Sequence, residues 1–316
     1  MSYSAVGMSG AFLHEALLYA GEEDFLARTV PFIAEGVERG EPIMVAVSRR
    51  KTEMLRWRLD GAADEVTFIE MTGLGRNPGR IIPAWSAFAA ERGGEGRALR
   101  GIGEPVWPER TSEELVECHH HESLLNLTFA DAGPFTLLCP YDTVALGDDA
   151  LETAWCTHPT VRANGAGRPS DAYLDPLATQ GPYAGPLAPA PDAAREYFFT
   201  RDYLKDLREI VLHRAEDAGV TPMRAGDLVL AVNEAATNSA VHSGGGGMLR
   251  IWEEGDAFVC EVRDGGTIRD PLAGRSRPEA AQDYGRGLYI VHQVCDLVQI
   301  RSGPEGTVVR LRMSLG

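Results

Sequence analysis

The chain has 316 residues, of which 44% are hydrophobic and 24% are charged, and its formal net charge at pH 7 is −16. This length predicts two domains, and the hydrophobic content is sufficient for a core in each. The strong negative charge disfavours a general electrostatic surface for nucleic acid, so we expect no direct nucleic-acid partner.

The cysteines and the apolar segments indicate a cytoplasmic protein. The cysteines are odd in number and form no CxxC pair, which is typical of reduced thiols and not of a disulfide framework or a zinc site; they are Cys118, Cys139, Cys156, Cys260 and Cys295. No signal peptide is evident at the start of the sequence. No run of about 18 apolar residues occurs, so we expect no membrane span.

The first half alternates between two patterns. Short apolar runs predict buried strands at residues 43–47, 66–69, 98–102 and 135–139. Helical patterns lie between them, at residues 23–39, 51–59, 80–91 and 112–130. This alternation predicts an α/β fold with a mostly parallel sheet covered by helices. Ligands in such folds bind beyond the carboxyl ends of the strands.

Three adjacent histidines, His119 to His121, lie on the helix predicted over residues 112–130. Neighbouring residues on a helix point in different directions. We therefore expect no metal site from these three histidines together.

Prolines and glycines are concentrated in residues 159–191, where no hydrophobic period is present. This composition predicts an extended, semi-rigid linker. The linker would separate an N-terminal domain over residues 1–158 from a C-terminal domain over residues 192–316.

The C-terminal part has a different order of elements. We expect helices over residues 193–218 and 225–242, strands at 248–253 and 257–263, a helix opening near Gly287, and a last hairpin of strands 298–301 and 307–313. This order predicts an α/β sandwich with a mixed or largely antiparallel sheet.

Glu234 and Asn238 are four residues apart on the helix predicted over residues 225–242, so their side chains share one face. The Asn238 amide oxygen suits Mg²⁺, a hard cation, and Glu234 can reach the same space as a base. A solvated polar face on an amphipathic helix is an equally good explanation of these two residues alone.

Further along, Asp264 ends a predicted strand and is followed by Gly265 and Gly266. A carboxylate there can accept a hydrogen bond from an adenine amino group, although a plain Asp-Gly turn is the better explanation of this segment alone. Gly285-Arg286-Gly287 precedes an apolar helix, whose free N–H groups can bind phosphate. Each of these signals is weak when it is considered alone.

The order and spacing of these segments resemble the GHKL ATPase superfamily, and within it the anti-sigma factor serine/threonine kinases. The matching segments are LAVNEAATNSAVHS, VRDGG, GRGLYIV and GTVVRL. The resemblance implies ATP and Mg²⁺ as cofactors, with Glu234 as the catalytic base and Asn238 as the metal ligand. It also implies a nucleotide-binding set of Asp264, Gly266, Gly285, Arg286, Gly287 and Thr307.

The N-terminal segments LLYAGEEDFL, GRNPGRIIPAW, GIGEPVWP, HESLLNL and LLCPYD resemble the methanogen/methylotroph sensory (MEDS) domain. The resemblance implies a signal-input module for a small ligand whose identity is unknown. Our candidates for its pocket are Glu104, Trp107, His121, Cys139 and Tyr141, and packing or loop roles explain these residues equally well.

Together these resemblances predict a cytoplasmic bacterial regulator in which a sensory domain controls a serine/threonine protein kinase. Its partners would be an anti-sigma factor antagonist, a sigma factor, or both, and dimerisation remains open. One alternative is a non-catalytic, nucleotide-gated protein-binding switch. Another is a sensor histidine kinase, for which His213 is the candidate phosphate acceptor.

Overall fold

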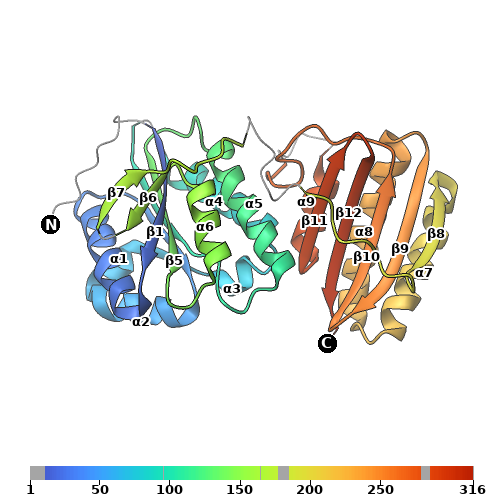
Figure 1. Cartoon of the computed structure of the whole chain (residues 1–316), viewed down its shortest axis with the longest axis horizontal. Coiled ribbons are helices and arrows are strands. Elements are labelled where there is room, and N and C mark those ends of the chain that lie inside the picture. The colour runs from blue at the N-terminus through green and yellow to red at the C-terminus, as the bar shows by residue number, and fades with distance from the viewer. Residues whose placement is uncertain (1–10, 95, 164, 177–184, 279–284, 316) are drawn as a thin grey trace. The chain divides into compact units, whose positions relative to one another are not determined.

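The computed structural model describes residues 11–94, 96–163, 165–176, 185–278 and 285–315. The chain divides into two compact units, Met1–Tyr183 and Ala184–Gly316. Each unit has its own sheet (Figure 1). Each also has its own hydrophobic core.

The first unit is built from alternating strands and helices (Figure 1). In chain order they are β1 (Phe12–Tyr19), α1 (Gly21–Glu38), β2 (Ile43–Val47), α2 (Arg49–Leu59), β3 (Val66–Glu70), α3 (Met71–Leu74), α4 (Ile81–Arg92), β4 (Leu99–Gly103), α5 (Ser112–Thr128), β5 (Phe135–Asp142), α6 (Asp148–Thr157), β6 (Thr160–Ala163) and β7 (Ala166–Pro169). Short 3₁₀ helices occupy Asp60–Glu65 and Pro78–Arg80.

The sheet of this unit has the strand order β3-β2-β4-β5-β1-β6-β7, and every pair is parallel except β6 with β7. The predicted mostly parallel sheet is therefore confirmed. Strand β1, which lies between β5 and β6, was not predicted from the sequence. Its sequence FLHEALLY includes the buried polar residues His14 and Glu15. These two residues interrupt the apolar run that is typical of a buried strand.

The linker predicted over residues 159–191 needs correction at both of its described ends. Strands β6 and β7 fall inside it and extend the first sheet, so residues 160–169 belong to the N-terminal unit. Near its other end, Ala190 packs with Ala194 against Trp252 of the second unit. The prolines of this region therefore lie in and around a short hairpin and a segment that packs on the surface of the second unit. Composition alone does not distinguish these two structures from a linker.

The second unit contains β8 (Arg195–Thr200), a 3₁₀ helix (Arg201–Tyr203), α7 (Leu204–Asp217), α8 (Pro222–His242), β9 (Gly246–Glu254), β10 (Ala257–Asp264), α9 (Arg286–Val294), β11 (Leu297–Gly303) and β12 (Gly306–Ser314). The strand order is β11-β12-β10-β9-β8, with all neighbours antiparallel. The helix predicted over residues 193–218 is wrong in its first part. Its aromatic segment Tyr197-Phe198-Phe199 forms β8 instead, since aromatic residues suit a strand and β9 offers a pairing edge.

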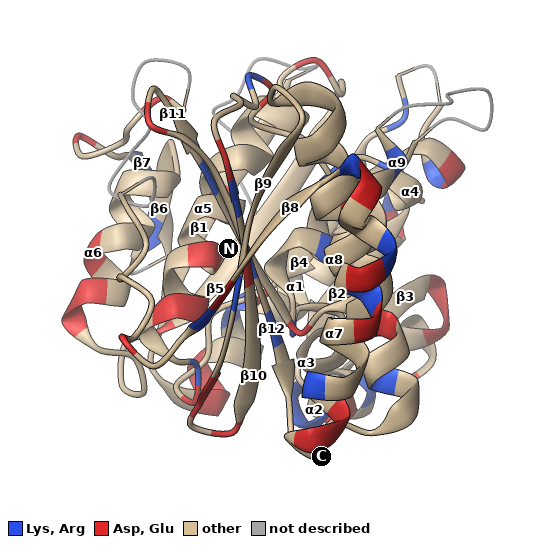
Figure 2. Ribbon diagram, turned by 90° about the vertical axis from the view of Figure 1, so that its right-hand side faces the viewer, with Lys and Arg blue, Asp and Glu red and all other residues tan. Residues whose placement is uncertain are grey.

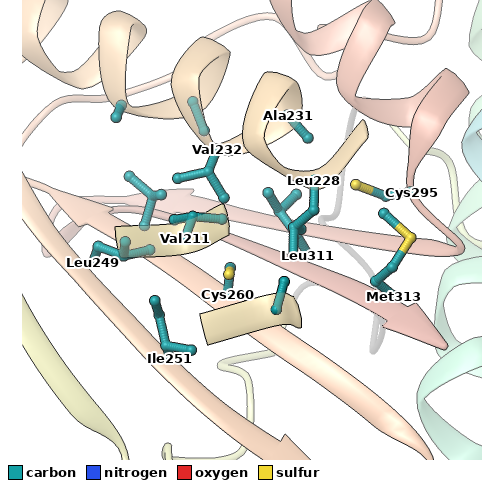
Figure 3. Close-up of a cluster of buried hydrophobic side chains, with 14 of the residues drawn as sticks. Val211, Leu228, Ala231, Val232, Leu249, Ile251, Cys260, Cys295, Leu311 and Met313 are labelled. Atoms are coloured by element: carbon teal, nitrogen blue, oxygen red, sulfur yellow. The ribbon is translucent and has the colours of Figure 1, made fainter. Parts of the chain in front are cut away.

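The core of the second unit lies between its helices and one face of its sheet (Figure 3). Val211 of α7 and Leu228 and Val232 of α8 pack over Leu249 and Leu311 from the strands. One face of α8 is buried, since Leu228, Val232, Ala235 and Ser239 all lie in the interior. Burying this face fixes the rotation of α8 about its axis and so fixes where its polar residues point.

Charged residues of both signs follow one another along α7, whose sequence is LKDLREIVLHRAED (Figure 2). This helix therefore presents no basic stripe of the kind that binds phosphate backbones. None of the helices in the described part of the chain combines the length and apolar character that crossing a membrane requires.

Candidate functional site

The second unit contains a cavity of about 500 Å³, which is within the range of about 300–1,000 Å³ usual for small-molecule sites. Its walls come from α8, the end of β10, the segment after it, the start of α9, and β12. The residues predicted from sequence that line it are Asn238, Asp264, Gly266, Gly285, Gly287 and Thr307. Residues separated by about 70 positions in sequence are therefore brought to one cavity.

Helix α8 presents the carboxamide of Asn238 to this cavity. The helix begins after Thr221 with Pro222 at its first position, where a missing N–H costs nothing. Ala235 and Ser239 are held in the core on its buried side. Glu234 lies one turn before Asn238 and is half-buried, outside the cavity wall itself.

Helix α9 begins beside these two residues of α8. Gly285, at its N-cap, has φ = 90°, a conformation that residues with a Cβ rarely adopt. A Cβ on Gly287 would lie 2.8 Å from Oε2 of Glu234 and 3.4 Å from Nδ2 of Asn238. The absence of a side chain at position 287 thus allows the start of α9, with its free N–H groups, to approach the carboxylate and the amide.

Asp264 is oriented by two hydrogen bonds at the cavity wall. The Ser239 hydroxyl donates to its Oδ2 at 2.6 Å, and the Gly266 N–H donates to its Oδ1 at 2.7 Å. Thr307 in turn donates to the Gly266 carbonyl at 2.9 Å and lies 2.8 Å from the hydroxyl of Ser302. This network holds the Asp264 carboxylate in one orientation, in which it can accept a hydrogen bond from an amino group.

Two of the predicted site residues do not line the cavity. Arg286 is the first residue of α9 but is exposed and does not line the cavity. Glu234 lies beside Gly287, which does line the cavity. No role at this site was predicted for Ser239 or Ser302, because a lone serine carries no pattern until its partner is known.

The cavity residues fit ATP and a magnesium ion. An oriented carboxylate suits the adenine amino group, the start of α9 suits phosphate, and the Asn238 amide oxygen suits a hard cation. The cavity is also large enough for a nucleotide-sized ligand.

In the first unit, Glu104 lies directly after β4 and is almost fully buried. It accepts hydrogen bonds from the Tyr19 hydroxyl at 2.7 Å and from the Lys51 ammonium at 2.5 Å. Burial raises the pKa of Glu104, and Lys51 opposes this effect. The carboxyl ends of β1 and β4 thus carry a buried, paired carboxylate, at the edge where the sequence analysis expected ligands.

A second buried group lies on β1, α5, β5 and the residue after α6. It comprises His14, Glu122, Cys139 and His158, whose candidate ligand atoms all lie within 4.8 Å of one another. Burial lowers the pKa of His14 to about 4 and raises that of Cys139 well above its usual range. Burial alone would raise the pKa of Glu122, but the two histidines outweigh it and hold that pKa well below its usual range.

The five residues predicted for one sensory pocket are therefore distributed over several surroundings. Glu104 contacts Tyr19 and Lys51, whereas Cys139 contacts His14, and Tyr141 lies edge-on to His158 at 5.6 Å. Trp107 stacks against the Arg110 guanidinium, and His121 is buried on α5. His14, Glu122 and His158 were not recognised as a group, because 144 positions separate the first from the last.

The comparisons with known proteins match each unit separately. Residues 13–159 match the family model of MEDS, the MEthanogen/methylotroph, DcmR Sensory domain. Residues 199–313 match the family model of the histidine kinase-like ATPase domain. No curated protein matches the chain.

One similar solved structure is that of the RsbU and RsbW domains of Rv1364c from Mycobacterium tuberculosis. It is 18% identical, with a TM-score of 0.31, and the match covers 40% of this chain and 33% of that chain. The chain therefore spans only about a third of that neighbour, and a likeness this distant carries no argument about activity.

Proposed function

Because this chain joins a MEDS sensory domain to a histidine kinase-like ATPase domain, we propose that it is a signalling regulator whose sensory domain controls an ATP-dependent serine/threonine protein kinase. A small molecule is the proposed input, and an anti-sigma factor antagonist is the proposed phosphorylation target. The observation that carries the kinase proposal is the convergence of Asn238, Asp264 and the start of α9 on one cavity, with Glu234 adjacent.

Each residue has a role in this proposal. Asn238 holds the magnesium ion, Asp264 accepts from the adenine amino group, and the first N–H groups of α9 hold phosphate. ATP supplies the phosphoryl group, whose charge the magnesium ion screens. Glu234 accepts the proton of the partner's serine hydroxyl, so that the serine oxygen becomes a better nucleophile.

A histidine kinase is the weaker proposal for this chain. His213 is exposed on α7, but the same helix buries Leu207, Val211 and Ala215 in the core of the ATPase domain. A histidine kinase needs its phosphate-accepting histidine on a separate dimerising helix that can move relative to the nucleotide site. Helix α7 does not meet this requirement, because it is packed into the domain that contains the site.

Radiolabelled ATP tests the proposal with the full-length protein and a candidate antagonist. We expect acid-stable label on a partner serine, and Glu234→Gln should reduce transfer by about 100-fold or more while ATP still binds, because general base catalysis contributes about 10²–10⁴-fold. Asn238→Ala should weaken binding of magnesium-ATP without unfolding the domain. His213→Ala is the matched control and should leave transfer unchanged.

Two results would contradict the kinase proposal. ATP binding without transfer to any antagonist would support the nucleotide-gated switch instead. Acid-labile label on the chain itself, lost in His213→Ala, would support the histidine kinase.

A further inference from the structure

We propose that the four buried side chains of the sensory domain, His14, Glu122, Cys139 and His158, bind one divalent transition-metal ion, with Zn²⁺ as the best fit. This inference is independent of the kinase proposal, because it concerns a different unit of the chain and a different ligand.

Three distances between the ligand atoms are close to those around a tetrahedral ion, and all four atoms lie within 4.8 Å of one another. Nε2 of His14 lies 3.0 Å from Oε2 of Glu122, and Nε2 of His158 lies 3.3 Å from the same oxygen. Tetrahedral zinc with bonds of about 2.0–2.1 Å places nitrogen and oxygen ligands about 3.3 Å apart. The 3.3 Å between Nε2 of His14 and Sγ of Cys139 is close to the value of about 3.6 Å for a longer zinc–sulfur bond.

The outer contacts of both histidines direct their Nε2 atoms inward. Nδ1 of His14 lies 3.1 Å from Oδ1 of Asn126, whose amide nitrogen donates to the Thr157 carbonyl at 2.8 Å, so Nδ1 of His14 carries the proton. Nδ1 of His158 lies 2.9 Å from the Ala154 carbonyl and must donate to it. In the neutral rings both Nε2 atoms therefore present lone pairs to the Glu122 carboxylate, an arrangement typical of metal-binding histidines.

The charge of the group also suits a divalent cation. In the described chain, the ion-pair partners of Glu122 are the two histidines, and its Oε1 atom has no hydrogen-bond partner. The side chains of Glu122 and both histidines are fully buried, where an uncompensated charge is costly. One carboxylate and one thiolate together balance a charge of +2, so the filled centre would be neutral.

Protons are the competing occupants of the same centre. Without a bound ion the buried Cys139 thiol carries a proton, and a divalent ion would bind the thiolate in its place. Metal uptake should therefore release protons, as is usual for thiol-containing sites.

The type of ligand set indicates the role of the ion. All four positions come from the protein, and the site is closed to solvent, which is typical of structural rather than catalytic zinc. The ligands come from β1, α5, β5 and the residue after α6, so the ion would hold together the centre of the sheet and two covering segments. The three histidines His119 to His121 lie outside this group.

The test uses the full-length protein, stripped with a chelator and then titrated with Zn²⁺ against a competing indicator. We expect one ion per chain, and Cys139→Ser and His158→Gln should each weaken binding by about 100-fold or more, since even outer-shell changes cost about 10–100-fold. Cys156→Ser is the matched control, because this half-buried cysteine is outside the group. It should retain wild-type affinity.

Co²⁺ titration of the wild-type protein keeps the test decisive if a ligand variant fails to fold. A thiolate-to-cobalt charge-transfer band and intense visible bands are expected for a tetrahedral site that contains Cys139. The proposal is overturned if the stripped wild-type protein binds neither ion, if the cobalt spectrum lacks thiolate ligation, or if both ligand variants fold and retain wild-type affinity, which would place any bound ion elsewhere.

Discussion

At the scale of single residues, the nucleotide cavity depends on close approach between α8 and α9. Gly287 is the contact point, because a Cβ there would meet the carboxylate of Glu234 at 2.8 Å. That carboxylate is the end of a flexible side chain and can move aside, so an added methyl group should displace Glu234 without disrupting the fold.

We therefore expect Gly287→Ala to fold normally and to lower phosphate transfer by about 100-fold, since a misplacement of about 1 Å in a catalytic group has an effect of this size. Steady-state transfer from radiolabelled ATP measures the effect. Gly226→Ala on α8 is the matched control, because nothing lies within 4 Å of its added Cβ. The Gly226→Ala variant should gain up to about 1 kcal/mol of stability and keep full activity. Wild-type transfer in Gly287→Ala would contradict the proposed role of this contact.

At the scale of secondary-structure elements, both faces of the sheet of the second unit have packing partners. Helices α7 and α8 cover one face, and the segment that contains Ala190 and Ala194 packs with Trp252 of β9. Arg310 of β12 joins this segment to the sheet, since its guanidinium donates to Glu261 at 2.9 and 2.6 Å and to the Ala188 carbonyl at 2.6 Å.

Arg310→Met should therefore destabilise the second unit by about 2–4 kcal/mol, because it removes charge-assisted hydrogen bonds from a buried carboxylate. Arg312→Met on the same strand is the matched control. Its partner Glu254 is half exposed, and such pairs contribute about 0–1 kcal/mol. Urea unfolding followed by circular dichroism measures both variants, and equal losses of stability would be inconsistent with a structural role for the buried pair.

At the scale of the whole molecule, two separate cores should respond separately to ligands. The nucleotide cavity belongs to the unit Ala184–Gly316, and the proposed metal centre belongs to the unit Met1–Tyr183. Binding stabilises the unit that holds the ligand by mass action.

Magnesium-ATP at about 100 times its dissociation constant should stabilise the second unit by about 2.7 kcal/mol. Hydrogen exchange read by mass spectrometry should show the largest added protection in peptides of residues 185–316, and Zn²⁺ should protect peptides of residues 11–176. Protection by magnesium-ATP that is as large in the first unit as in the second would show that the two cores do not unfold independently.

The sequence by itself determined the class of both folds and most of the second unit. Period-2 and helical patterns located β9, β10, α8 and the final hairpin, because each depends on local spacing of apolar residues. The motifs around Glu234, Asp264 and Gly287 were readable for the same reason, since each is contiguous in the chain. Their roles in binding and catalysis remain predictions.

Only the tertiary structure decided which distant residues meet. His14 and His158 lie next to one another because β1 inserts between β5 and β6, a sheet order that no local pattern specifies. The same applies to β8, where pairing with β9 overrode a helical pattern, and to β6 and β7, which turn part of an apparent linker into sheet. Strand pairing is a long-range interaction, so its outcome depends on the whole fold and not on the residues of one segment.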